Sequence, residues 1–298
     1  MEALLGSNPS GCFMPEYELD PEDVQYNGCD LIDRAIERYN PSMVMGLFSG
    51  GDDSLTACHV ASKHPNFSGC LHINTGIGIP ETGEFVRDTC KTRGWDLKEY
   101  KAVDQGQDYD EWVKTHGFPG PYMHRQMYNR LKERSLKKFI AEHKSHYNDR
   151  IMLISGCRSD ESTRRMGTVN PIQRDPRNTP SHIWVAVIHD WSKKNCLDYL
   201  EENNVERNPV VKNIGKSGEC LCGAFAKKGE LEHLVKHYPS IVDRIEDLER
   251  EVRDTFPWGW EDPGPPKWFT EKQNGQCFMF DMTEAPGPMC SSCHKGKL

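Results

Sequence analysis

One stretch decides how this chain begins its fold: residues 49–54, with the sequence SGGDDS. It follows the apolar run 43–48 and precedes residues 55–61, whose pattern is helical, so it forms the turn between a strand and a helix. Paired glycines permit positive φ angles and let a ligand approach the backbone. The N–H groups of the first helical turn face such a loop, and the helix dipole favours negative charge there. The stretch therefore predicts a site for phosphate or pyrophosphate.

The order of residues in this loop matches one known type of phosphate-binding loop. It is not a Walker loop, which would close with Gly-Lys-Ser or Gly-Lys-Thr. It resembles the PP-loop of the N-type ATP pyrophosphatases, usually written Ser-Gly-Gly-x-Asp-Ser. That loop often carries lysine at x, whereas this chain has Asp52, so one cation expected near the phosphates is missing. The resemblance implies a Mg²⁺ ligand at Asp53 and phosphate contacts from Ser49, Gly50, Gly51 and Ser54.

Strand and helix patterns alternate over the first two thirds of the chain. We expect strands at 43–48, 70–74, 97–103, 151–154 and 183–188, and helices at 27–39, 80–94, 192–203 and within 125–144. Several of the strands are unbroken apolar runs, which is typical of strands covered on both faces. The alternation predicts an α/β fold with a doubly wound, mostly parallel sheet. The loop resemblance implies the adenine nucleotide alpha hydrolase-like form of that fold, whose ligands bind beyond the carboxyl ends of the strands.

The pattern changes late in the chain. Residues 208–219 are predicted to form a loop, and residues 221–255 two helices that break near Pro239. The aromatic-rich segment 256–298 is expected to fold back over the domain. We expect three parts: an irregular segment 1–26, a nucleotide-binding PP-loop domain 27–215, and a cysteine-rich extension 216–298 that closes a metal or cluster site.

A second motif follows the strand predicted at 70–74. The run Asn74-Thr75-Gly76 places a hydroxyl and a bare backbone at the strand end, and Pro80-Glu81-Thr82 comes shortly after. By itself this pattern fits a turn. It resembles the Asp-Thr-Gly and Pro-Glu-Thr segment of the PAPS (phosphoadenosine phosphosulfate) reductase and ATP sulfurylase branch of the PP-loop superfamily. In that branch the segment borders the adenosine pocket, which implies nucleotide contacts from Thr75 and Gly76.

A third motif follows the strand predicted at 151–154. Arg158 is a planar cation suited to bidentate binding of phosphate or sulfate oxygens. An ion pair at the surface is the simpler alternative. The motif resembles the Gly-x-Arg-x-x-Glu-Ser signature of the same branch through Gly156, Arg158, Glu161 and Ser162, with Glu161 placed to orient the arginine. A further likeness, over residues 184–208, is expected to reflect core packing more than function.

Twelve cysteines and no secretion signal predict a cytoplasmic protein with reduced thiols. Cys58, Cys70, Cys90 and Cys196 fall singly in apolar patterns and are expected in the core. Two close pairs remain, Cys220 with Cys222 and Cys290 with Cys293, and such pairs are typical of soft ligands around zinc or an iron–sulfur cluster. The resemblance to assimilatory APS (adenosine phosphosulfate) reductases and DNA phosphorothioation ATPases, which carry clusters, favours 4Fe–4S over zinc.

Composition limits the classes of partner. Charged residues make up 28% of the 298 residues, and mean hydropathy is −0.72. No apolar run is long enough to span a membrane, so no membrane partner is expected. The formal net charge of −8 does not favour a nucleic-acid surface, although a nucleic-acid acceptor stays open. The expected partners are an adenine nucleotide, a sulfur or electron donor protein, and a second copy of the chain.

The leading interpretation is an enzyme of sulfur metabolism that cleaves ATP to AMP and pyrophosphate. It would activate an acceptor for iron–sulfur-assisted sulfur transfer, with Asp53 and Arg158 as catalytic residues. The alternative is a sulfonucleotide reductase that acts on PAPS or APS and releases sulfite. Those reductases use a cysteine in a C-terminal Glu-Cys-Gly-x-His segment, which this sequence lacks, so Cys157 or Cys277 would have to replace it. A third interpretation is a non-catalytic nucleotide-binding module with a structural metal.

Overall fold

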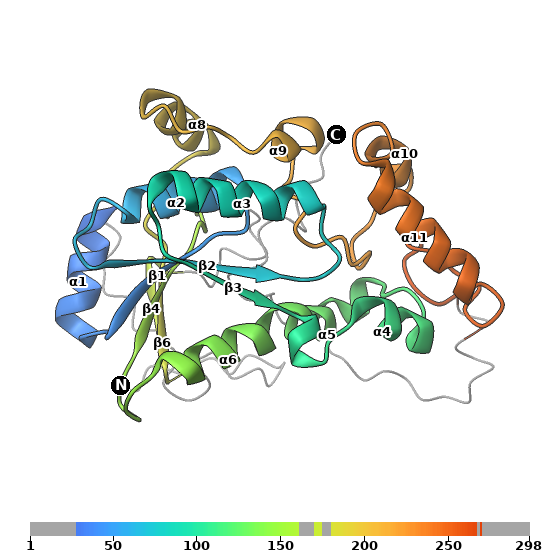
Figure 1. The fold of residues 1–298 in the computed structure, drawn as a ribbon, viewed down its shortest axis with the longest axis horizontal. Coiled ribbons are helices and arrows are strands. Elements are labelled where there is room, and N and C mark those ends of the chain that lie inside the picture. The colour runs from blue at the N-terminus through green and yellow to red at the C-terminus, as the bar shows by residue number, and fades with distance from the viewer. Residues whose placement is uncertain (1–27, 161–169, 175–179, 267–268, 270–298) are drawn as a thin grey trace, which may run out of the picture.

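A computed structural model of the chain describes residues 28–160, 170–174, 180–266 and 269. Its centre is a six-stranded sheet in the order β3-β2-β1-β4-β6-β5 (Figure 1). The strands are β1 (Met43–Leu47), β2 (Phe67–Asn74), β3 (Leu97–Lys101), β4 (Ile151–Ile154), β5 (Ile172–Gln173) and β6 (His182–Val185). Neighbouring strands run parallel except β5 and β6, which are antiparallel. The predicted α/β fold with a mostly parallel sheet is therefore confirmed.

The strand order reverses at β1, which lies between β2 and β4. The register of β1 with β4 sets Met43 opposite Ile151 and Gly46 opposite Ile154. All four residues of β4 are buried, because secondary structure covers both faces of the sheet. A pocket lies where β1 and β4 end, lined by Ser49 on one side and Gly156 on the other. The chain thus has a small pocket at the switch point of the sheet, where open α/β sheets bind ligands.

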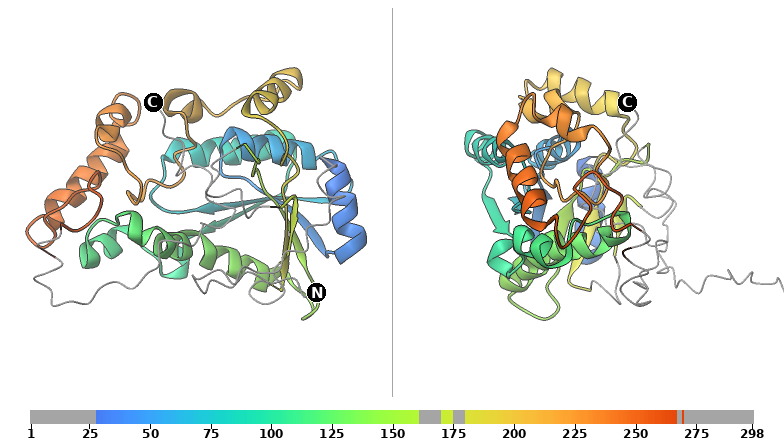
Figure 2. Two further views of the ribbon diagram at one scale, coloured as in Figure 1. Left: turned by 180° about the vertical axis from the view of Figure 1, so that it is seen from behind. Right: turned by 90° about the vertical axis from the view of Figure 1, so that its right-hand side faces the viewer.

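Helices lie on both faces of the sheet, as the views from opposite sides show (Figures 1 and 2). One face carries α1 (Cys29–Tyr39), α2 (Asp52–Ala61), α3 (Pro80–Arg93) and α8 (Lys193–Glu202). The other carries a run of α5 (His124–Tyr128), the π-helical turn η4 (Asn129–Glu133) and α6 (Arg134–His143). Leu136 and Phe139 of α6 pack on the sheet residues Met45, Leu71 and Ile73. The helix expected within residues 125–144 is present, and it contains one π-helical turn.

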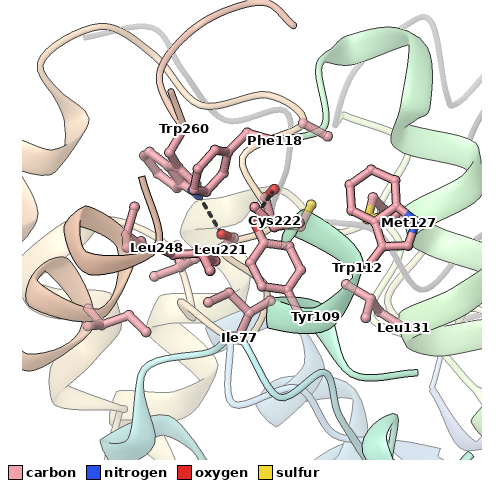
Figure 3. Packing of buried hydrophobic residues seen from close by; sticks show 14 of the residues in the cluster. Ile77, Tyr109, Trp112, Phe118, Met127, Leu131, Leu221, Cys222, Leu248 and Trp260 are labelled. Carbon is pink, nitrogen blue, oxygen red and sulfur yellow. Dashed lines mark hydrogen bonds between the residues drawn. The ribbon is translucent and has the colours of Figure 1, made fainter. Parts of the chain in front are cut away.

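A second apolar core lies at the end of the sheet where β2 stops (Figure 3). Its helices are α4 (Tyr109–His116), α10 (Glu230–Leu234) and α11 (Pro239–Val252). The segment after α11 returns to this core: the buried Trp260 donates its indole N–H to the Leu221 carbonyl at 2.7 Å. Trp258 donates in the same way to the Phe118 carbonyl at 2.9 Å. The expected return of the aromatic segment is therefore confirmed for its described residues.

One helix stands where the sequence predicts a loop. Helix α9 (Pro209–Ile214) begins after Asn208, whose side-chain oxygen accepts the Val210 N–H at 2.9 Å. A proline at the first helical position and an asparagine cap are both favourable starts for a helix. The prediction of a loop over 208–219 was wrong at this point because the helix is short and shows little periodicity.

Two further boundaries differ from expectation. Strand β6 ends at Val185, although the apolar run continues to Ile188, because residues 186–188 are buried in a turn and not in the ladder. Helix α4 was not predicted; it begins at Tyr109, after the cap residue Asp108, whose side chain accepts the N–H groups of Asp110 and Glu111. In the described part of the chain, no helix combines the length and apolar character that a membrane crossing requires.

Candidate nucleotide site

The loop after β1 takes a conformation that requires glycine at residue 50. The φ angle of Gly50 is +75°. A Cβ added there would lie 2.7 Å from the Cγ2 of Thr82 and 3.3 Å from the Nδ2 of Asn208. Asn208 also donates from Nδ2 to the Gly50 carbonyl at 2.9 Å. The residue that caps α9 therefore holds the loop from the other side.

The two serines of the loop contact each other. The Ser49 hydroxyl lies 3.2 Å from the Ser54 hydroxyl, and the Ser49 N–H donates to the same Ser54 oxygen at 3.3 Å. Ser54 in turn donates to the Gly51 carbonyl at 2.9 Å. These bonds close the loop over the first turn of α2, with Gly51 as the residue that precedes the helix. A bound phosphate would meet both hydroxyls at one place.

The end of β4 approaches this turn at backbone distance. A Cβ on Gly156 would lie 2.7 Å from the carbonyl carbon of Asp53 and 2.7 Å from the nitrogen of Ser54. Glycine is needed here because the third motif of the chain packs directly on the loop. This contact brings Arg158, two residues further on, to the acidic start of α2.

Three cations surround the two aspartates at the start of α2. Arg158 approaches Asp53 at 3.4 Å and Lys193 approaches it at 2.9 Å. Asp52 receives two bonds from Arg207, at 3.0 Å from Nε and 2.9 Å from Nη2, and lies 3.0 Å from Lys193. The Arg158 side chain is fully buried, and it also contacts Asp160.

The charged forms of Asp52 and Lys193 are favoured in this cluster. Burial by itself raises the pKa of Asp52, but the bonds from Arg207 and Lys193 outweigh burial and hold that pKa below its ordinary value. Burial lowers the pKa of Lys193, and the carboxylates of Asp53 and Asp52 outweigh it, so the pKa is raised. Opposite charges at about 3 Å thus favour the charged forms of Asp52 and Lys193.

Two pockets meet at the loop, and the serines Ser49 and Ser54 line both. The first, here called the phosphate pocket, is lined by Ser49, Gly51, Asp52, Asp53, Ser54, Lys193, Val211, Gly215, Lys216 and Ser217. The second, the switch-point pocket, is lined by Leu47, Phe48, Ser49, Ser54, Leu71, Ile73, Lys132, Ser155, Gly156 and Glu219. The first is rich in charge, and the second combines four apolar side chains with three serines and the charged residues Lys132 and Glu219.

Comparison with known proteins agrees with this geometry. A family model for the phosphoadenosine phosphosulfate reductase domain matches residues 43–241, which include the loop, both pockets and the arginine motif. The chain belongs to this family. It is therefore a member of the PP-loop superfamily, as the loop predicted.

Two relatives have no described function. An uncharacterized protein of Methanocaldococcus jannaschii is 26% identical over 229 residues, which are 74% of this chain and 52% of that protein. The chain thus spans about half the length of this relative. An uncharacterized 37.8 kDa protein of Escherichia phage 186 is 24% identical over 123 residues, which are 41% of this chain and 36% of that protein.

Solved structures with a similar fold include two nucleotide enzymes. The PAPS reductase of Candida auris, in complex with phosphate, has a TM-score of 0.48 at 17% identity and covers 65% of this chain and 87% of its own. The FMN adenylyltransferase of Candida glabrata, in complex with FAD and inorganic pyrophosphate, has a TM-score of 0.45 at 13% identity. That alignment covers 65% of this chain and 59% of the other.

The second PAPS reductase motif is tied to the segment before the first cysteine pair. Thr75 is buried, its N–H donates to the Glu219 carboxylate at 3.0 Å, and its hydroxyl donates to the Glu219 carbonyl at 2.5 Å. Gly76 is exposed, and its N–H donates to the Asn74 side chain at 2.9 Å. The Asn74 amide also donates a hydrogen bond to the Glu99 carboxylate at 3.1 Å. An ionised aspartate at this position could not donate that bond. The nucleotide contacts expected of Thr75 and Gly76 stay a prediction.

The first cysteine pair lies beside the second core. Cys222 is buried in that core, and Cys220 packs against it. The Cys222 carbonyl accepts the Tyr109 hydroxyl at 2.9 Å (Figure 3). Within the described residues, no group of three or more His, Cys, Asp or Glu is placed to hold a metal. The predicted ligands Cys290 and Cys293 lie outside the described residues, as do Glu161, Ser162 and Cys277.

The sequence did not predict three side chains that contact the loop, nor the lysine that lines the switch-point pocket. Lys193, Arg207 and Asn208 fall in the segment 184–208, which was expected to serve core packing. Lys193 could have been found, because it opens the helix after β6 and the carboxyl ends of parallel strands share one edge. Lys132 lies in the π-helical turn, which places it in the switch-point pocket, and no local pattern marks such a turn. The four predicted core cysteines are buried, as expected.

Proposed function

We propose that this PAPS reductase family member binds ATP with Mg²⁺ and cleaves it between the α- and β-phosphates. The observation that carries the proposal is the start of α2, where the first turn of the helix and three cations meet the loop. The pyrophosphate part of ATP would lie in the phosphate pocket, over Ser49 and Gly51. The nucleoside would extend toward the switch-point pocket.

The residues present fit a nucleotide-bound Mg²⁺. Mg²⁺ prefers oxygen ligands and is commonly held by one or two carboxylates together with substrate phosphates. Asp53 offers such a carboxylate in the phosphate pocket. Bound there with the substrate, Mg²⁺ would neutralise phosphate charge. Asp52 is less available, because its side chain is 1% exposed and Arg207 binds both its oxygens.

The chain's own residues would act on the charge that develops during cleavage. An acceptor nucleophile forms a bond to the α-phosphorus as the bond to the bridging oxygen breaks, and the electron pair leaves with pyrophosphate. The loop N–H groups and the two serine hydroxyls would bind the leaving pyrophosphate, where its negative charge increases. We propose that Arg158, from the end of β4, binds the phosphate or the acceptor. The acceptor is thereby adenylylated.

We further propose that the four paired cysteines hold a 4Fe–4S cluster, with zinc as the alternative. The described half of the set, Cys220 and Cys222, has the right ligand chemistry and follows directly on Glu219, which lines the switch-point pocket. Such a cluster would supply sulfur or electrons close to the activated acceptor. A sulfur or electron donor protein is the partner that this chemistry implies.

A sulfonucleotide reductase is the second candidate, and one observation favours it. The family model that matches the chain is that of the PAPS reductase domain. Cys157, the candidate nucleophile, is adjacent to Arg158 in the chain and is 1% exposed. A nucleophile must reach the substrate, and this burial is the reason that we rank the reductase second.

One assay pair separates the two candidates. The purified protein is incubated with ATP and Mg²⁺, and AMP and pyrophosphate are measured. In parallel it is incubated with PAPS or APS and reduced thioredoxin, and sulfite is measured. We expect AMP and pyrophosphate without sulfite. Sulfite release that is lost in Cys157→Ser would establish the reductase instead.

A further inference from the structure

The loop lacks the lysine that PP-loops often carry, yet the ammonium group of Lys193 contacts the residue at that position of the loop. Asp52 occupies that position of the loop. Lys193, from the first turn of α8, brings its Nζ to 3.0 Å from the Asp52 carboxylate and 2.9 Å from that of Asp53. It also lines the phosphate pocket. Lys193 of α8 therefore supplies the pocket with a cation that the loop does not contain.

The backbone of Lys193 is held firmly while its side chain remains accessible. Ser192 caps α8, with its hydroxyl accepting the Asn195 N–H at 3.1 Å. The N–H of Lys193 itself donates to the Asp160 carboxylate at 3.2 Å. The side chain is 37% exposed, whereas that of Asp52 is 1% exposed. The backbone of Lys193 is thus anchored, while its ammonium group is accessible from the pocket.

The partners of Lys193 can release it without losing all compensation. Asp52 keeps its two bonds from Arg207 when Lys193 leaves. Asp53 keeps Arg158 at 3.4 Å and becomes free to bind the Mg²⁺ that arrives with a nucleotide. Exchange of two carboxylates for phosphate oxygens leaves the ammonium paired with anions throughout. An exchange of like for like costs little and can be driven by ligand binding.

We propose that Lys193 is the cation that binds the terminal phosphates of the nucleotide, and that Asp52 and Asp53 hold it in the unliganded protein. This inference rests on the proposed function, because it assigns a residue to the polyphosphate of ATP. It makes Lys193 a specificity residue: it favours nucleotides that carry β- and γ-phosphates over AMP. The lysine also makes binding depend on Mg²⁺, which replaces it at Asp53.

The test measures nucleotide binding by calorimetry, without any turnover. Wild type, Lys193→Met and Lys193→Arg are titrated with ATP and with AMP, each with and without Mg²⁺. Lys194→Met is the matched control, because Lys194 is the next residue, is 82% exposed and pairs with Asp198. Lys193→Met should weaken ATP binding about tenfold to hundredfold, the value of one charge-assisted bond. AMP binding should change less than about twofold, and Lys193→Arg should recover part of the loss.

Each outcome supports or overturns a stated claim. Equal ATP affinity in wild type and Lys193→Met overturns this inference alone, and so does an equal loss for ATP and AMP. Wild-type protein that binds no ATP overturns the proposed function and the inference with it. Circular dichroism and thermal unfolding check that each variant is folded. If Lys193→Met does not fold, Lys193→Gln, which retains a donor for both aspartates, is titrated in its place, and the same outcomes apply.

Discussion

Three cationic side chains converge on the aspartates of the loop, and each comes from a different part of the chain. Arg158 follows β4, Lys193 opens α8, and Arg207 lies in the segment between α8 and α9. Two adjacent carboxylates would repel each other and any phosphate without these partners. The cluster therefore explains how a loop with an extra acid can still be a site for an anionic ligand.

Asp53→Asn should abolish the formation of AMP and pyrophosphate from ATP, with a loss of about 100-fold or more. The amide keeps the size of the side chain but removes the charge that a metal needs. The melting temperature should change little, because Lys193 and Arg158 retain Asp52 and Asp160 as partners. Pyrophosphate release measures the effect, and the exposed Asp88→Asn serves as control. Turnover at the wild-type rate would remove Asp53 from the mechanism.

Arg207→Met should destabilise the fold by about 1–3 kcal/mol at pH 7, because a buried carboxylate loses its bidentate partner. The sign of the pH dependence follows from Asp52, whose pKa is held below its ordinary value. Its contribution to stability is present above the unfolded-state pKa of about 3.9 and is lost as pH falls through the lower folded-state pKa.

The difference in unfolding free energy between wild type and Arg207→Met should therefore be smaller at pH 3 than at pH 7. Urea unfolding at pH 7 and at pH 3 measures it. Arg207→Lys should recover only part of the deficit, since a lysine cannot bind both oxygens in the same way. A deficit that stays constant across this range would show that Asp52 is not the partner responsible.

At the scale of elements, helix α9 and the loop stabilise each other through one asparagine. Asn208 accepts the Val210 N–H at 2.9 Å as the cap of α9 and donates to the Gly50 carbonyl at 2.9 Å. A side chain with both a donor and an acceptor is required for this pair of bonds. The position of the loop thus depends on a helix that begins more than a hundred residues later in the chain.

Two substitutions of Asn208 should separate these roles. Asn208→Asp keeps the helix cap but sets a buried carboxylate oxygen against the Gly50 carbonyl, so it should weaken ATP binding and lower the unfolding free energy by about 1–3 kcal/mol. Asn208→Ala loses both bonds, and its unfolding free energy should be about 1–2 kcal/mol lower than that of wild type. Urea unfolding and ATP titration measure the two effects. Equal ATP affinity in Asn208→Asp and wild type would contradict a role for the Gly50 bond.

At the scale of the whole molecule, two apolar cores lie on either side of the site. The sheet and its flanking helices form the larger set of clusters, and the second core gathers α4, α11 and the returning tryptophans. The strand-like segment 217–222 joins them: Leu221 N–H donates to the Ile77 carbonyl and Ile79 N–H to the Gly218 carbonyl, both at 2.9 Å. The first cysteine pair is therefore fixed next to the nucleotide-binding half.

The proposed iron–sulfur cluster belongs to this scale, because its cysteine ligands would come from both ends of the extension 216–298. Protein purified without oxygen should be brown, with a broad band in the visible blue that bleaches in air. Cys220→Ser, Cys222→Ser, Cys290→Ser and Cys293→Ser should each lower the iron content per folded chain. Cys196→Ser, a buried core thiol, should leave it unchanged. A colourless protein with one zinc per chain would replace the cluster with a structural zinc site.

The sequence by itself determined the sheet, the loop and the family. Unbroken apolar runs, paired glycines and a loop hexapeptide act over a few neighbouring residues, so their meaning can be read locally. The same patterns placed Asp53, Gly156 and Arg158 at the carboxyl edge of the strands. They overlooked α9, because a short capped helix has too few residues to show a period.

Only the tertiary structure decided which side chains complete the site. Arg207 reaches Asp52 across 155 residues, and Lys193 reaches Asp53 across 140. Arg207 lies between α8 and α9, where no local pattern marks it, and a lysine in the first turn of a helix is ordinary in sequence. Their function depends on the side-by-side packing of α2 and α8 on the sheet, and such packing is a property of the folded chain and not of any segment in it.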